Sequence, residues 1–133
     1  MIARVLHFDA FADRPGMGNP AGVLLDARGL RDAAMQAIAR AVGFNETAFV
    51  LPATRADLRL RYFTPGHEVD LCGHATIGSF VALYHHGLLP GQGLPSRDGR
   101  VSVWVDTRGE EHHVRVGGTG CFVRELEIEL PHD

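Results

Sequence analysis

The 133-residue chain contains no lysine, because all thirteen of its basic side chains are arginines. A pyridoxal phosphate Schiff base and a Walker-type phosphate loop both need a lysine amine, so the absence excludes these two kinds of site. The arginines are scattered singly along a chain of formal net charge −3. Such a chain has no basic stripe to follow a phosphate backbone, and we expect no nucleic-acid partner.

Long apolar runs and cysteines are also scarce. No stretch approaches the ~18 consecutive apolar residues of a membrane span, and the N-terminal segment turns acidic too early for a signal peptide. We therefore expect a cytoplasmic protein with no membrane partner. The two cysteines, Cys72 and Cys121, lie far apart in the sequence and are expected to be free thiols rather than a disulfide framework.

The remaining composition indicates one globular domain, residues 1–133. Hydrophobic residues make up 45% of the chain and charged residues 22%, which is enough apolar material for a core. Alternating or short apolar runs predict strands at 2–11, 21–25, 47–51, 57–63, 101–106, 113–116 and 122–130. The turn-rich segment 13–20 is expected to be a loop.

Two segments have helical spacing instead. Apolar residues over 30–42 recur every three or four positions, and Gly43 stands where a left-handed C-terminal cap is expected. The segment 75–86, which Gly87 closes, is apolar nearly all round, and such a helix is usually surrounded by protein. We predict the α+β class: a mostly antiparallel curved sheet or barrel wrapped around a central helix at about 75–86, with a second, outer helix at about 30–42.

The stretch from Phe63 to Gly78 places Cys72, Gly73 and His74 where a loop becomes the buried helix. The first turn of a helix has unpaired N–H groups and a partial positive charge, so it can bind a carboxylate or stabilise developing negative charge. A glycine there lets a ligand approach the backbone. A cysteine there is expected to have a lowered pKa, which favours the thiolate.

Each candidate also has a purely structural interpretation. Cys72 is a small apolar residue that packs well, and His74 is within reach of a helix terminus as a cap. Glu46, by composition alone, is a solvated loop carboxylate. The adjacent pairs His85–His86 and His112–His113 cannot chelate one ion, and the chain has no H-x-x-x-H, C-x-x-C or carboxylate triad. No metal site is therefore expected.

Five motifs resemble, in order and spacing, the N-terminal half of the PhzF-like isomerases, which have the diaminopimelate-epimerase fold. They are His7-Phe-Asp-Ala-Phe-Ala, Gly18-Asn-Pro-Ala-Gly-Val, Gly43-Phe-Asn-Glu-Thr-Ala-Phe-Val, Phe63-Thr-Pro and Glu68-Val-Asp-Leu-Cys-Gly-His-Ala-Thr-Ile-Gly. They span roughly residues 5–86, and five linked motifs form a specific signal. The family's fold is two similar domains, each a barrel-like sheet around a central helix, with the substrate between them. The resemblance implies that this chain is one such half domain.

The resemblance also implies roles for particular residues. Glu46 matches the family's general acid/base carboxylate, which moves a proton between carbons of a small carboxylate or amino-acid-like substrate. The expected catalytic residues are Glu46, His74 and Cys72, and the expected substrate-binding residues are Asn19, Gly73, Ala75 and Thr76. No cofactor is implied for this cofactor-independent chemistry.

The sequence departs from the family in length. Full-length relatives have a second domain with a D-P-x-T-G-S loop that completes the site, and this sequence has no such segment. Residues 93–130 instead resemble the family's C-terminal tail. We expect a homodimer that restores the two-domain cleft, because the exposed face of half such a structure is apolar and needs covering. A separately encoded, complementary half-chain is the alternative partner.

Two other functions stay open at this point. Diaminopimelate epimerases and proline racemases use two thiols on opposite faces of the substrate α-carbon, and a symmetric dimer could present two Cys72 thiols in this way. The chain would then be a cysteine-pair amino-acid racemase or epimerase. Alternatively, it is a non-catalytic ligand-binding or partner subunit that lacks the second half-site.

Overall fold

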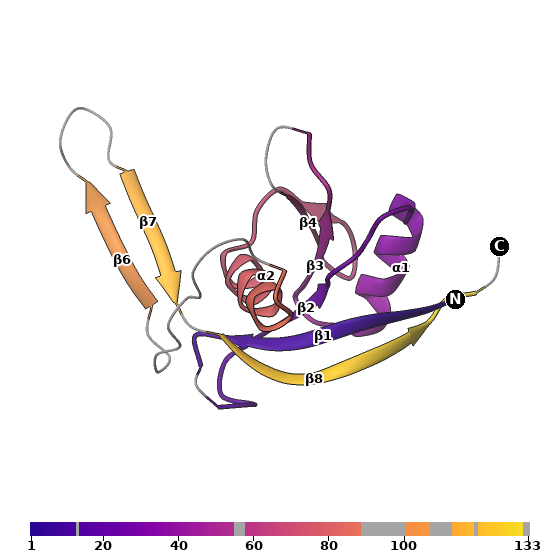
Figure 1. Ribbon diagram of the computed structural model, residues 1–133, viewed down its shortest axis with the longest axis horizontal. Helices are drawn as coiled ribbons and strands as arrows, with labels where there is room; N and C mark the ends of the chain where they lie inside the picture. Colours follow the sequence, from indigo (N-terminus) through magenta and orange to yellow (C-terminus); the bar gives the residue numbers. More distant parts are fainter. Residues whose placement is uncertain (13, 55–57, 89–100, 107–112, 119, 132–133) are drawn as a thin grey trace.

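The computed structural model describes residues 1–12, 14–54, 58–88, 101–106, 113–118 and 120–131 (Figure 1). The elements are β1 (Ile2–Ala10), β2 (Asn19–Leu24), α1 (Asp32–Val42), β3 (Glu46–Leu51), β4 (Arg59–Phe63), β5 (Glu68–Val69), α2 (Gly73–His85), β6 (Val101–Asp106), β7 (His113–Gly118) and β8 (Gly120–Glu129). Six strands form one sheet in the order β5-β4-β3-β2-β1-β8. β6 and β7 form a separate hairpin that projects away from this sheet (Figure 1). The predicted α+β class is confirmed.

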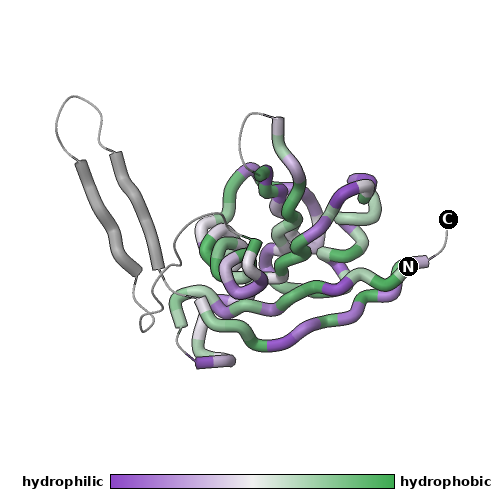
Figure 2. The backbone as a smooth tube through the Cα atoms, in the orientation of Figure 1, coloured by the Kyte–Doolittle hydropathy of each residue, from purple (hydrophilic) through white to green (hydrophobic). Residues whose placement is uncertain are grey.

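The sheet is antiparallel except where β2 pairs with β3. Parallel neighbours need a crossover connection, and here the crossover carries α1. Parallel pairing also brings the starts of β2 and β3 to the same edge of the sheet, with Ala21 opposite Glu46. On the other side, β8 pairs with β1 along nearly its whole length, and the hydropathy alternates along β8 (Figure 2).

The core is divided between the two faces of the sheet, because successive side chains of a strand point to opposite faces. The cluster around α1 includes Val5, Leu24, Met35, Ile38 and Phe49. The cluster around α2 includes Leu6, Phe8, Val23, Ala82 and Leu83. Full burial of one large apolar side chain stabilises a fold by about 1.5–3 kcal/mol, so these clusters fix both helices on the sheet.

α1 has the C-terminal cap that the sequence predicted. Gly43 adopts a left-handed conformation, with φ of 75°, and donates its backbone N–H to the carbonyl of Ala39. The helix begins at Asp32 rather than at residue 30. Asp32 in the first turn and Arg40 in the last turn both have the sign of charge that the helix dipole favours.

α2 packs on the sheet through a face of small residues. Its buried positions are Ala75, Gly78, Ser79, Ala82 and Leu83. A methyl group at Gly78 would lie 3.5 Å from the Cβ of Phe8, so the helix backbone approaches β1 closely. The sequence indicated a helix enclosed all round, but the described residues do not enclose α2 completely. Tyr84, on another face, is 44% exposed.

A few other boundaries differ from the sequence prediction. Asn19 and Pro20, expected in a loop, are the first residues of β2, and the two-residue strand β5 was not predicted. Residues 93–100 of the tail-like segment, and His112, lie outside the described residues. Among the described residues, no helix combines the length and hydrophobicity that crossing a membrane requires.

A buried carboxylate holds the loop between β1 and β2. Asp9 is 2% exposed, accepts a hydrogen bond from the Gly16 amide at 2.6 Å, and lies 2.9 Å from His7 Nε2. The loop then passes Ala10 so closely that a methyl group at Gly18 would lie 2.4 Å from the Ala10 carbonyl oxygen. Asn19, the next residue, is therefore placed by backbone packing.

We predict that Gly18→Ala lowers the free energy of unfolding by about 2 kcal/mol, because the added methyl group overlaps backbone that cannot move freely. Gly66→Ala is the matched control, since a methyl group there meets only Thr64 Oγ1 at 3.9 Å. The control should change stability by less than about 0.5 kcal/mol. Urea denaturation measures both, and equal midpoints for the two variants would contradict the prediction.

Candidate functional site

Glu46, Cys72 and His74 meet where β3 and α2 begin. His74 Nε2 lies 3.0 Å from Glu46 Oε2, and His74 Nδ1 lies 3.2 Å from Cys72 Sγ. The imidazole ring therefore touches the carboxylate and the thiol at once. The structure thus brings together the three residues that the sequence nominated as catalytic, although Glu46 comes from a different element.

Small side chains make this meeting possible. Ala21, Ala48 and Ala75 pack together between the sheet and the first turn of α2, in a cluster that also contains Tyr62 and Cys72. Glu46 lies two residues before Ala48 in β3, so it shares the sheet face that α2 covers. Because the cluster is built from methyl-sized groups, the first turn of α2 lies close to the start of β3.

Glu46 is not the solvated loop carboxylate that composition alone suggested. It is the first residue of β3, its side chain is only 21% exposed, and that of His74 is 12% exposed. Its Oε2 atom is buried and has no aligned hydrogen-bond donor, although His74 Nε2 is near. A carboxylate oxygen in this position is free to accept a proton or a ligand.

Cys72 is the N-cap residue of α2, in extended backbone conformation, and is 7% exposed. Burial raises the pKa of the Cys72 thiol, and the negative charge of Glu46 raises it further, while the N–H groups of Ala75 and His74 oppose both effects. The expectation that the helix terminus lowers this pKa was therefore wrong in its net direction. Cys72 packs in the core and stays a thiol at neutral pH.

The first turn of α2 offers backbone rather than side-chain groups. Gly73 is exposed, and nothing lies within 4 Å of the position that a methyl group would take there, so a ligand can approach its amide. Ala75 is fully buried. The Thr76 hydroxyl donates to the Cys72 carbonyl at 2.7 Å and lies 2.6 Å from the Tyr62 hydroxyl. These two side chains stabilise the turn, and substrate binding by Ala75 and Thr76 remains a prediction.

Tyr62 was not nominated from the sequence. It lies in β4, is 5% exposed, and contacts the first turn of α2 through Thr76. The alternation of β4 could have placed it on the α2 face, but nothing in the sequence pairs it with Thr76. Burial raises the pKa of Tyr62, so it remains a neutral hydroxyl.

Asn19 reaches the same edge of the sheet. It is the first residue of β2 and lies two residues before Ala21, which is opposite Glu46 in β3. By strand alternation, Asn19 shares the sheet face of Ala21 and Glu46. Its predicted role as a substrate-binding residue is compatible with this placement and stays a prediction.

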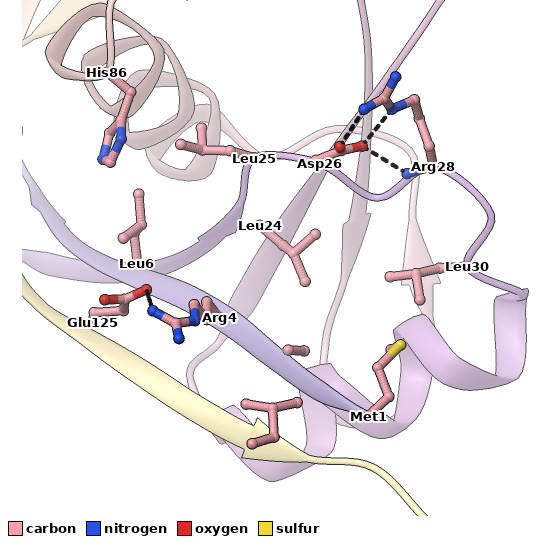
Figure 3. Close-up of a pocket in the computed structure, with 12 residues that line it drawn as sticks. Met1, Arg4, Leu6, Leu24, Leu25, Asp26, Arg28, Leu30, His86 and Glu125 are labelled. Carbon is pink, nitrogen blue, oxygen red and sulfur yellow. Dashed lines mark hydrogen bonds and ion pairs between the residues drawn. The ribbon is translucent and has the colours of Figure 1, made fainter. Parts of the chain in front are cut away.

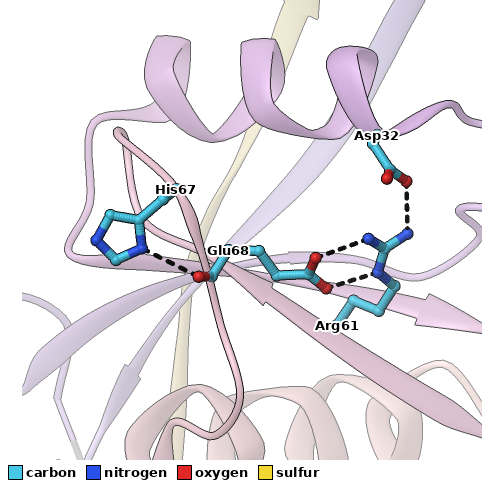
Figure 4. Close-up of polar contacts among 4 residues, drawn as sticks. All are labelled: Asp32, Arg61, His67 and Glu68. Atoms are coloured by element: carbon cyan, nitrogen blue, oxygen red, sulfur yellow. Dashed lines mark hydrogen bonds and ion pairs between the residues drawn. The ribbon is translucent and has the colours of Figure 1, made fainter.

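Ion pairs and hydrogen bonds position the segment that leads from β4 to Cys72. Arg61 donates to both carboxylate oxygens of Glu68, at 2.7 and 2.8 Å, and to Asp32 at the start of α1 (Figure 4). The Arg61 guanidinium holds the pKa of Glu68 below its usual value. Gln36 of α1 donates to the Thr64 carbonyl at 2.8 Å. α1 thus anchors the segment from the opposite side of the sheet.

A cavity of about 390 Å³ lies elsewhere, around the start of β1 (Figure 3). Its lining is mainly apolar, and its charged groups pair with one another. Arg28 binds both carboxylate oxygens of Asp26 and lowers the pKa of Asp26 to about 2, and Arg4 lies 3.9 Å from Glu125. Glu46 does not line this cavity, and the charged side chains that do line it are already paired. The cavity is therefore a weaker candidate for the catalytic site than the cluster of Glu46, Cys72 and His74.

We predict that alkylation of Cys72 by iodoacetamide, measured in a Cys121→Ser background, has a pH midpoint above that of a free cysteine. Burial and the Glu46 charge both disfavour the thiolate. Glu46→Gln removes one of these causes, so the midpoint should move to lower pH. Glu127→Gln, on the exposed strand β8, is the matched control and should leave the profile unchanged. An equal or higher midpoint in Glu46→Gln would show that the carboxylate does not act on the thiol.

Comparison with known proteins supports the sequence resemblance. The isomerase YfhB of Bacillus subtilis, itself uncharacterized, is 52% identical over 87 residues, which are 65% of this chain and 30% of YfhB. The crystal structure of the PhzF-family phenazine biosynthesis protein of Bacillus anthracis matches with a TM-score of 0.69 at 45% identity, over 87% of this chain and 40% of that one. The predicted epimerase PA4716 of Pseudomonas aeruginosa matches with a TM-score of 0.57 at 34% identity, over 84% and 37%.

The chain spans 30% to 40% of the length of these relatives. The family match itself extends over residues 8–116 and so includes the end of β1, both helices and the segment that contains Glu46, Cys72 and His74. The chain therefore belongs to the PhzC-PhzF family of phenazine biosynthesis-like proteins.

Proposed function

We propose that the chain acts as a cofactor-independent isomerase that moves a proton on a small carboxylate or amino-acid-like substrate, with Glu46 as the acid and base. The observation that carries this proposal is the state of Glu46 Oε2, which is buried, lacks an aligned donor and lies 3.0 Å from His74 Nε2. Relatives named isomerase and predicted epimerase support the reaction class.

The reaction needs one group that takes a proton from a substrate carbon and returns it to another position. In the proposed mechanism Glu46 accepts this proton, and the electron pair of the broken C–H bond stays on the substrate as enolate-like charge. The N–H groups in the first turn of α2, above the open side of Gly73, stabilise that charge. His74 lies against Glu46 and orients the carboxylate between the two proton transfers.

The cysteine-pair racemase is less well supported by the geometry. A thiol base must ionise, and both burial and the Glu46 charge raise the pKa of Cys72. Both causes disfavour the thiolate at Cys72. We therefore assign the proton transfer to Glu46 and a supporting position to Cys72.

We predict that the wild-type protein incorporates deuterium from D2O into its substrate, and that Glu46→Gln slows this exchange by at least about 100-fold, since an amide cannot accept the proton. Candidate cyclic and unsaturated amino acids are incubated in D2O and followed by NMR. Glu127→Gln is the control, with a carboxylate that is 62% exposed on β8. Equal label incorporation by wild type and Glu46→Gln would remove Glu46 from the mechanism.

We further propose that the site works in a homodimer, in which a second copy covers the exposed start of α2. Leu71, directly before Cys72, is 76% exposed, and Met17, in the loop before Asn19, is 67% exposed. Both are exposed apolar side chains within two residues of a site residue in the sequence. Exposed apolar surface near a site is typical of surfaces that bind a protein partner. Covering the edge would also exclude water from Glu46.

We predict that the wild-type protein has twice the chain mass of 14.5 kDa in solution, and that Leu71→Asp shifts it to a monomer by placing a charge in the proposed interface. Ile2→Asp is the control, because Ile2 is 59% exposed but lies at the opposite end of β1. Light scattering after gel filtration measures both. A wild-type monomer at all concentrations would reject the homodimer and favour a complementary half-chain.

A further inference from the structure

We propose that Glu46, Cys72 and His74 also form a binding site for a soft divalent cation such as Zn²⁺, and that the metal-bound protein is an inhibited form. A carboxylate oxygen, a thiolate sulfur and an imidazole nitrogen are the three ligand types that proteins offer to zinc. One such atom from each residue lies within 4.8 Å of the other two.

The separations between these atoms fit one coordination sphere. Zinc bonds of ~2.0–2.3 Å on a tetrahedron place neighbouring ligand atoms roughly 3.3–3.6 Å apart. His74 Nε2 is 3.0 Å from Glu46 Oε2 and 3.9 Å from Cys72 Sγ. The first distance is shorter than the tetrahedral value and the second is longer, so the side chains must rotate to accommodate the ion.

A second observation points to a ligand at this place. Glu46 Oε2 is buried but has no aligned hydrogen-bond donor, and a buried carboxylate oxygen is normally satisfied. A cation between the three side chains would satisfy it directly. His74 Nδ1 lies 3.2 Å from Cys72 Sγ, and this contact opens when Nε2 and Sγ both turn toward the ion.

The ligands are also held by regular structure. Glu46 begins β3, and Cys72 caps α2, where its carbonyl accepts hydrogen bonds from the amide and the hydroxyl of Thr76. Above Gly73 the site is open, which leaves room for water as a fourth ligand. The sequence indicated no metal site because zinc motifs are local, whereas this ligand set joins a strand to a distant helix start.

Metal binding has a defined chemical consequence. The Cys72 thiol loses its proton to solvent as the sulfur–metal bond forms, and the metal takes the lone pair of Glu46 Oε2. Glu46 can then no longer accept a proton from a substrate carbon. The inhibition rests on the proposed function, whereas the binding itself does not.

Cobalt is the probe, because Co²⁺ takes the place of Zn²⁺ in such sites and reports a thiolate ligand by a charge-transfer band. We expect one Co²⁺ per chain, with a band that added Zn²⁺ abolishes. Cys72→Ser should remove the band, and Glu46→Gln and His74→Gln should each weaken binding at least about tenfold. Cys121→Ser, the other cysteine, is the matched control and should retain the full signal.

A wild-type protein without the band, or a band that survives Cys72→Ser, would overturn the proposal. The unfolding temperature provides a second readout that does not depend on the ligand variants. Zn²⁺ should raise it in wild type and in Cys121→Ser by mass action, and an unchanged wild-type temperature would also overturn the proposal. Deuterium exchange into the substrate is measured separately. A cobalt charge-transfer band in a protein without exchange activity would reject the proposed isomerase function but support the metal site.

Discussion

The close packing of α2 on β2 and β3 is the constraint on which the rest of the site depends. Ala21, Ala48 and Ala75 leave so little side-chain volume between helix and sheet that the first turn of α2 lies beside the start of β3. A larger residue at any of these positions would push the Cys72–His74 turn away from Glu46. The contact between the His74 imidazole and the Glu46 carboxylate therefore depends on the small size of these three alanine side chains.

Because the carboxylate of Glu46 lies so close to the thiol of Cys72, its charge affects whether the thiol can lose its proton. The Glu46 charge and burial keep Cys72 protonated, against the pull of the N–H groups of Ala75 and His74. His74 contacts both the carboxylate and the thiol. A second negative charge, on Cys72, is therefore disfavoured, which supports the proposal of one carboxylate base over a pair of thiols.

The features that the sequence predicted correctly are those that depend on residues close together in the chain. Strand alternation, the helical spacing of α1 and the Gly43 cap are set by residues near one another, and the structure confirms them. The joining of Glu46 to Cys72 followed only from the family resemblance, because no local signal links a strand start to a helix cap. The sign of the Cys72 pKa shift was missed, since the helix terminus is visible in sequence but burial and a tertiary carboxylate are not. β5 was missed because two residues are too few to show the alternation of apolar and polar residues that predicts a strand.

Three features of the described site would change if a partner or ligand bound there. Glu46 Oε2 has no aligned hydrogen-bond donor besides its 3.0 Å contact with His74 Nε2, Gly73 faces open space, and Leu71 is 76% exposed. A buried oxygen without an aligned donor and an exposed apolar side chain both raise the free energy of the folded state. In the proposed homodimer a second copy would cover Leu71, but it would add a hydrogen bond to Glu46 Oε2 only if it brought a donor. In the two proposals, substrate and metal would compete for the same carboxylate oxygen, and whichever binds more tightly would determine whether the proposed chemistry takes place.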